Sequence, residues 1–195
     1  MLELPAVIHR DQNGNERAVS LTTRLLQDRI VLCQGEIRDE LAESVTAQLL
    51  YLASENPDEP ITMVINSQGG SVTAGLAIID IMESISCPVY TVISGLSASM
   101  GIVIAASGEK GHRRIYPSAR VMIHQVSGGY SGNVQDARVN YKEMERINDV
   151  AMERLAKCCG KDVETIKSDS QRDLWLNAQE AIDYGCCDEI VKKRK

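Results

Sequence analysis

Two serines stand where a nucleophile would be useful. Ser99 opens a strongly apolar segment, residues 99–107, which predicts a helix, and it follows a strand predicted over residues 89–93 and a short turn. A hydroxyl at a helix N-terminus lies near free backbone N–H groups and the positive end of the helix dipole, which suits a nucleophile whose attack creates an oxyanion. An ordinary N-cap serine is the commoner explanation of such a position. Ser97 competes for the same role, and spacing alone does not separate the two serines.

A general base has few candidates, because the chain contains only three histidines. His9 lies in a polar N-terminal segment and His112 in a charged turn, whereas His124 closes an apolar strand and precedes a glycine-rich loop. The ends of strands in α/β proteins are where functional groups are presented. A buried structural histidine would explain His124 as well. Asp173 is a polar residue beside an apolar stretch, and on its own it is more typical of a solvated or capping aspartate.

A glycine-rich segment, residues 66–70, follows a predicted strand and precedes a predicted helix. It lacks the Gly-Lys-Ser/Thr of a P-loop and does not match G-x-G-x-x-G, so the sequence predicts no nucleotide site there. Glycines at such a turn can bring backbone N–H groups close to a carbonyl oxygen or an extended peptide.

Strands and helices alternate along the first two thirds of the chain. This order predicts an α/β fold with a largely parallel sheet. The predicted strands are residues 29–33, 61–65, 89–93 and 120–125. The first predicted helix begins at residue 39 and is stopped by Asn56-Pro57, and two further helices are predicted over residues 73–83 and 99–107.

The longest predicted helix spans residues 133–159 and ends at Gly160. At 1.5 Å per residue it is roughly 39 Å long, more than a small domain needs to cover its own sheet. Packing against another subunit and a plain surface helix explain it equally well. A second helix is predicted from Asn177, with Glu180 completing a capping box, to Gly185. Residues 1–20 show no amphipathic period, and we expect a mobile arm.

Length and composition exclude several classes of protein. A chain of 195 residues suggests a single domain, and its net charge of −6 argues against nucleic acid or an anionic membrane surface as a partner. No apolar run approaches the roughly 18 residues of a membrane span, and no leader is apparent, so we expect a cytoplasmic protein. The six cysteines have neither C-x-x-C nor Cys/His spacing, which favours reduced thiols over zinc or disulfides. Phenylalanine is absent, so the core must be aliphatic.

Four segments, in this order, resemble the ClpP serine peptidases, the proteolytic subunits of ATP-dependent Clp proteases. Any one of them alone would be weak, but together they are specific, and the resemblance covers nearly the whole chain. The segments are residues 65–75, 98–101, 120–125, and 172–173 followed by 181–185.

The resemblance implies a catalytic triad. It puts the nucleophile of the family on Ser99, the general base on His124 and the orienting carboxylate on Asp173. It also implies an oxyanion hole built from the backbone N–H groups of Gly70 and Met100.

The resemblance also implies a fold and an assembly. The fold is the crotonase-like α/β spiral, a single domain over residues 1–195 with residues 1–20 as an axial arm. Residues 125–160 form a handle that interlocks two stacked heptameric rings, and residues 125–133 form a strand beside the extended substrate. No cofactor is implied for this chain. ATP is used by a separate hexameric AAA+ unfoldase, such as ClpX, ClpA or ClpC, which delivers unfolded protein substrates.

The chain departs from the family pattern where the unfoldase docks. The family pocket is rich in aromatic and bulky apolar side chains, and a more polar pocket buries less apolar area, at about 25 cal/mol per Å². We therefore expect weak docking, or work beside a paralogous ring. Gln68 and Val126 replace usual prolines, and Gln171 replaces a usual acidic residue. The pocket positions here are Thr62, Val64, Ser84, Val92, Ser94, Arg114 and Tyr116.

Two other functions compete with an active serine endopeptidase. One is a catalytically weak structural or regulatory ring subunit, which would not be labelled at Ser99 by a fluorophosphonate. The other is a crotonase-type acyl-CoA enzyme, whose turnover would survive Ser99→Ala because backbone donors hold its thioester enolate.

Overall fold

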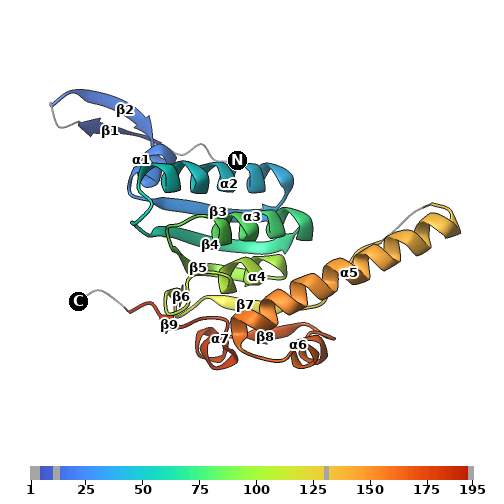
Figure 1. The fold of residues 1–195 in the computed structure, drawn as a ribbon. Helices are drawn as coiled ribbons and strands as arrows, with labels where there is room; N and C mark the ends of the chain where they lie inside the picture. Colours follow the sequence, from blue (N-terminus) through green and yellow to red (C-terminus); the bar gives the residue numbers. More distant parts are fainter. Residues whose placement is uncertain (1–4, 11–13, 130–131, 193–195) are drawn as a thin grey trace.

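The computed structural model describes residues 5–10, 14–129 and 132–192, and within them a seven-stranded, largely parallel sheet forms the centre of the molecule (Figure 1). This confirms the predicted α/β class. One path of parallel neighbours runs β3 (Ile30–Ile37), β4 (Ile61–Gly70), β5 (Val89–Ala98), β6 (Arg113–Ile115), β9 (Glu189–Ile190).

The sheet divides along β5. Residues 91–93 of β5 pair with β6, whereas residues 96–98 pair in parallel with β7 (Arg120–Ile123). A short strand, β8 (Leu174–Leu176), then pairs antiparallel with β7. The carboxyl end of β5 therefore lies against a different neighbour from the rest of that strand, and the residues that follow β5 and β7 are brought together.

Helices cover the sheet in the order of the chain. Figure 1 shows α2, α3 and α4 in succession beside β3, β4 and β5, with α2 packed on α3 and α3 on α4. The helices are α1 (Leu21–Gln27), α2 (Asp39–Glu55), α3 (Val72–Ser84), α4 (Met100–Ala106), α5 (Val134–Cys159), α6 (Val163–Asp169) and α7 (Ala178–Tyr184).

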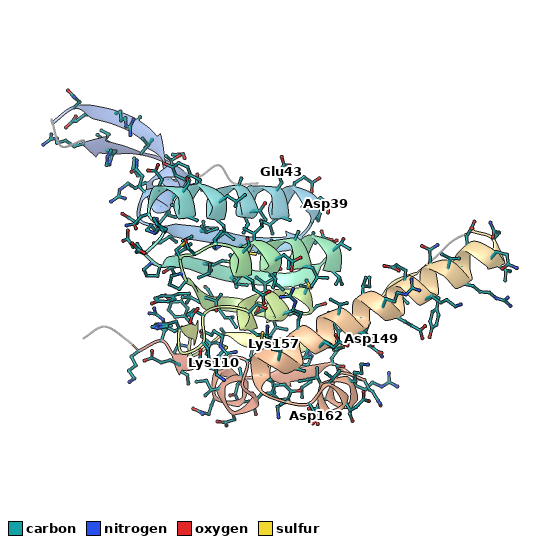
Figure 2. All side chains as sticks on the ribbon, viewed as in Figure 1. Asp39, Glu43, Lys110, Asp149, Lys157 and Asp162 are labelled. Carbon is teal, nitrogen blue, oxygen red and sulfur yellow. The ribbon has the colours of Figure 1, made fainter. Side chains whose placement is uncertain are left out.

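The core is aliphatic, as the composition predicts. Helix α2 buries one stripe, with Val45, Leu49 and Leu52 inward, while Asp39 and Glu43 are exposed on its outer side (Figure 2). Every residue of α4 is buried, which explains its uniformly apolar sequence. Isoleucine dominates the largest fully buried side chains, which are Ile37, Leu49, Ile61, Met63, Ile65, Ile78, Ile79, Ile93, Ile102, Ile104, Ile115 and Ile123.

Strands β4 and β5 are longer than predicted. The sequence predicts turns after residues 65 and 93, but the strands continue to Gly70 and Ala98. The polar extensions pair with one another after a register shift, with Ser67 opposite Ser97, and Gly70 pairs with Ile37 of β3. Cross-strand hydrogen bonds thus keep polar and glycine residues extended, which local propensity does not reveal.

The N-terminal segment contains a hairpin within residues 1–20, where the sequence predicts a mobile arm. Strands β1 (Ala6–Arg10) and β2 (Glu16–Ser20) pair antiparallel and project from the body (Figure 1). Most of the hairpin is exposed, so its strands show no apolar alternation. Residues 1–4 and 11–13 of the predicted arm lie outside the described residues. The mobility of the arm stays a prediction.

Helix α5 matches the predicted long helix within one residue. Asn133 caps it by accepting from the N–H groups of Gln135 and Asp136, and Gly160 ends it in the left-handed conformation with φ 67°. Its buried residues all lie in the last third, and the rest extends away from the body (Figure 1). The exposed apolar side chains on the extending part are Val134, Val139 and Tyr141.

The helix near the C-terminus also begins and ends as predicted. Asn177 and Glu180 form the capping box of α7, and Gly185 ends this helix with φ 96°. Among the described helices, none is both long and apolar enough to cross a membrane.

Candidate active site

Ser99 lies alone between the last residue of β5 and the first residue of α4. Its φ of 55° and ψ of −126° fall in a region that residues other than glycine rarely occupy. Its N–H donates to the carbonyl of Met122 at 2.9 Å, and its own carbonyl accepts from Ile102 at 3.2 Å. Its hydroxyl makes no capping bond to α4, which excludes the ordinary N-cap explanation. The chain therefore turns sharply from strand to helix at Ser99, and the hydroxyl of this serine can bond to a group outside the helix.

The two competing serines have different environments. Ser97 is fully buried within the sheet, and its Oγ has no hydrogen-bond partner within the described part of the chain. Ser99 is only partly buried. The structure thus makes Ser99 the serine that a substrate can reach.

His124 supplies that other partner. It follows the last residue of β7, and its Nε2 lies 2.8 Å from Oγ of Ser99. The pairing of β7 with the end of β5 brings the residues after the two strands together. The side chain of His124 is 24% exposed and contacts the candidate nucleophile, which favours a general base over a buried structural histidine.

Asp173 lies on the other side of the imidazole. Leu174 of β8 pairs with Ile123 of β7. Because the two strands are antiparallel, Asp173, which precedes Leu174, lies beside His124, which follows Ile123. Oδ1 of Asp173 is 3.7 Å from Nδ1 of His124, a distance too long for a hydrogen bond. The carboxylate side chain is 58% exposed. Ser99, His124 and Asp173 thus lie in a row, with a short contact between serine and histidine and a longer one between histidine and aspartate.

Of the two predicted oxyanion donors, Met100 lies next to Ser99, whereas Gly70 lies against β3. Met100 is the first residue of α4, so its N–H has no carbonyl acceptor within the helix. Gly69 lies directly against the nucleophile, because a Cβ there would be 2.6 Å from Cβ of Ser99 and 3.1 Å from N of Met100. Gly70 packs on the next strand, where a Cβ would be 2.2 Å from the carbonyl oxygen of Ile37. Sequence reasoning missed Gly69, and its only signal was the glycine pair itself.

The segment after His124 is irregular over residues 125–129, and residues 130–131 lie outside the described residues. In the described part of this single chain no strand pairs with it, and the predicted strand beside an extended substrate stays a prediction. Two bonds fix its beginning: Gln125 N–H donates to the carbonyl of Ser170 at 3.2 Å, and Val126 N–H to Oδ1 of Asn148 at 2.9 Å. The contact of Asn148 in α5 with this segment is one that the sequence did not reveal.

Metal chemistry has no visible site in the described ranges. Within residues 5–10, 14–129 and 132–192, no three or more His, Cys, Asp or Glu side chains are grouped to hold a metal ion. The absence of a cofactor stays a prediction.

Comparisons with known proteins agree with this geometry. The family model described as Clp protease matches residues 13–194. The chain belongs to the Clp protease family. It is also 47% identical over 191 residues to the "ATP-dependent Clp protease proteolytic subunit" of Leuconostoc citreum (strain KM20), covering 97% of this chain and 95% of that protein.

Membership of the Clp protease family confirms the predicted recognition and makes the chain a serine peptidase. The mixed α/β structure is that of the family. An acyl-CoA enzyme of the crotonase type is disfavoured, because both comparisons point to a peptidase.

Proposed function

We propose that this Clp protease subunit cleaves peptide bonds of unfolded polypeptides through an acyl-enzyme on Ser99. The observation that supports this most is the 2.8 Å contact between Nε2 of His124 and Oγ of Ser99. In the first step Oγ attacks the carbonyl carbon of the substrate while Nε2 accepts the hydroxyl proton. The imidazolium then gives that proton to the leaving amine as the C–N bond breaks. Water repeats the sequence on the ester and releases the new carboxyl terminus.

Asp173 and two backbone amides complete the proposed mechanism. The carboxylate holds the His124 ring in the tautomer whose Nε2 accepts a proton, and it stabilises the imidazolium that forms. The N–H groups of Met100 and Gly70 stabilise the oxyanion of the tetrahedral intermediate. The loose contact of Asp173 fits a site that tightens when substrate or a neighbouring subunit arrives.

The test is hydrolysis of a short fluorogenic peptide by the purified chain, with native mass measured in the same buffer. Ser99→Ala should reduce turnover by at least about 10³-fold, because the nucleophile is gone. Ser97→Ala is the matched control, since its Oγ is buried without a hydrogen-bond partner in the described residues and its loss should leave turnover unchanged. Equal activity of the two variants would exclude Ser99 as the nucleophile. A correctly assembled wild-type protein without activity would favour the structural or regulatory subunit.

We infer that α5 joins this chain to further copies, in two stacked heptameric rings that enclose the active sites. Its N-terminal part extends from the body and carries exposed Val139 and Tyr141, apolar side chains that a neighbouring subunit would cover. Val139→Asp with Tyr141→Asp should lower the native mass. A ring assembly of unchanged mass in this variant would contradict the role of α5.

The ATP-dependent step requires a separate chain. The matched relative is named as part of an ATP-dependent protease, and we infer that a hexameric AAA+ unfoldase delivers unfolded substrates to this chain in the cytoplasm. The expected docking positions combine apolar and charged side chains. Val64, Val92 and Arg114 lie side by side on β4, β5 and β6. We therefore expect weak docking or the help of a paralogous ring. Strong stimulation of the pure protein by one unfoldase would refute weak docking.

A further inference from the structure

Four of the six cysteines gather at a place that the proposed mechanism does not use. Cys158 and Cys159 end α5, and Cys186 and Cys187 follow α7. The Sγ atoms of Cys159 and Cys186 are 3.5 Å apart, and all six cysteines are free thiols. Two thiols in contact, from segments that are distant in sequence, differ from the isolated buried cysteines of an ordinary core.

The backbone holds these two thiols together whatever their oxidation state. Gly185, with φ 96°, lies so close to α5 that a Cβ there would be 2.4 Å from the carbonyl oxygen of Cys159. The N–H of Cys186 donates to the carbonyl of Ala181 at 2.9 Å, which fixes the turn after α7. A disulfide needs an Sγ–Sγ distance of about 2.05 Å, and we expect side-chain rotation to close the gap from 3.5 Å.

The two thiols differ in reactivity. The hydrogen bond from Cys186 lowers the pKa of Cys159, the positive charges of Arg113 and Lys161 lower it further, and burial opposes them. The same hydrogen bond and burial raise the pKa of Cys186. Cys159 is only partly buried, whereas Cys186 is fully buried. A partly accessible, more acidic thiol beside a fully buried one is the arrangement of an attacking and a resolving cysteine.

We propose that Cys159 and Cys186 are a redox-modification site, at which a peroxide converts the two thiols into a reversible disulfide. The thiolate sulfur of Cys159 attacks one peroxide oxygen, the O–O bond breaks, and the leaving hydroxide takes a proton to become water. The sulfur of Cys186 then attacks the sulfenic sulfur of Cys159 and displaces its OH, which leaves as the second water with the proton of Cys186. Two thiols are oxidised, and one peroxide is reduced to two waters.

The disulfide would close the segment of residues 160–185, which contains α6, β8 and Asp173. Oxidation would therefore tie the turn after α7 to the end of α5 and close a loop that carries the orienting carboxylate. A thiol reductant reverses the bond, in keeping with the transient disulfides of reducing compartments.

The neighbouring cysteines are suitable controls. Cys158 bonds to the hydroxyl of Ser107 with its Sγ 3.7 Å from Oγ, and burial raises its pKa. Burial raises the pKa of Cys187 to about 12. Both lie one residue from the proposed pair, and each should leave the crosslink intact when replaced.

The test treats the reduced, assembled protein with hydrogen peroxide, blocks remaining thiols, and maps disulfides after trypsin without reduction. We expect residues 158–161 joined to residues 173–192, with fragmentation placing the bond between Cys159 and Cys186 and dithiothreitol removing it. Cys159→Ser and Cys186→Ala should each abolish the crosslink, while Cys158→Ser and Cys187→Ala should keep it. The wild-type map stands even if one variant fails to fold.

Several outcomes would overturn the proposal. These are a bond through Cys158 or Cys187, a bond between two chains, oxidation of Cys159 to sulfinic acid with Cys186 still reduced, or full recovery of free thiols after peroxide.

Discussion

Ser99 has a backbone conformation that costs roughly 1–3 kcal/mol, and contacts with the surrounding residues stabilise it. Its side chain type and its partner His124 were foreseen from strand and helix ends and from the family resemblance. The strain itself was not foreseen, because it arises from β7 and Gly69, which are distant in sequence. The folded chain shows that Gly69 leaves the space that Ser99 occupies, a contact that its position in the sequence does not reveal.

Replacing Gly69 with alanine should therefore damage both stability and catalysis. Its φ is +94°, and a Cβ would lie 2.6 Å from Cβ of Ser99 and 2.8 Å from the carbonyl oxygen of Ala98, which is backbone and cannot yield cheaply. We expect a loss of stability of at least about 2 kcal/mol and a large loss of peptide hydrolysis.

Gly35→Ala is the matched control for this prediction. Gly35 also has positive φ, +84°, but a Cβ there meets no atom within 4 Å. It should cost only about 1 kcal/mol, with activity retained. Equal urea-unfolding midpoints and equal activities for both variants would show that the clash at Ser99 is unimportant.

Asp173→Asn tests the orienting carboxylate. An amide cannot favour the tautomer that leaves Nε2 free, and comparable changes cost up to about 10⁴-fold in turnover. Because this carboxylate is 58% exposed and 3.7 Å from the ring, we expect a loss of about 10²–10⁴-fold in kcat with little change in KM. Asp183→Asn, an exposed change on α7, should leave kcat unaltered. An unaltered kcat in Asp173→Asn would remove Asp173 from the mechanism.

The ends of helices were the elements best predicted from the sequence. Caps are local, so Asn133, Gly160, Asn177 and Gly185 could be recognised from their own neighbours. The carboxyl ends of β4 and β5 could not, because their polar residues stay extended through pairing with other strands. The N-terminal hairpin could not be predicted either, because its strands bury little of either face and so show no apolar pattern.

Asn177→Ala should destabilise the fold without touching the chemistry. It removes the side-chain acceptor of the Glu180 N–H, at 3.0 Å, and with it the capping box of α7. The expected cost is about 1 kcal/mol in the free energy of unfolding, measured with urea. Gln179→Ala, one residue into the same helix, should cost no more than about 0.5 kcal/mol. A larger effect from Gln179→Ala would mean that the cap does not hold this helix.

One ion pair joins distant parts of the whole molecule. Arg113 of β6 is 5% exposed and binds Asp188 at 2.6 Å, and it also donates to the carbonyls of Ala106 and Cys158. It thus ties the ends of α4 and α5 to the segment before β9. No sequence pattern predicts this contact, because Arg113 and Asp188 are 75 residues apart in the chain.

This ion pair predicts a pH dependence of stability. Burial raises the pKa of Asp188, but hydrogen bonds from Arg113 and from the Gly111 N–H outweigh it and leave the pKa below the ordinary 3.8. The folded state therefore binds this proton less readily than the unfolded state. The contribution to stability is complete above pH 3.8 and is lost as the pH falls through the lower, folded pKa.

Asp188→Asn should cost roughly 3 kcal/mol at pH 7, because it leaves a buried guanidinium without its counter-ion. Below about pH 4 the difference from the wild type should shrink as its own carboxylate is protonated. Urea unfolding at several pH values measures this, with the exposed Asp183→Asn as control. A difference that stays constant down to pH 3 would contradict the assigned ion pair.

Acylation of Ser99 can be observed directly by treating the assembled protein with a fluorophosphonate and locating the adduct by peptide mass. One adduct per chain on Ser99 is expected, retained in Ser97→Ala and lost in both Ser99→Ala and His124→Ala, because the hydroxyl reacts only when the imidazole accepts its proton. An intact assembly that takes up no reagent, or one that takes it up at Ser97, would contradict the proposed mechanism.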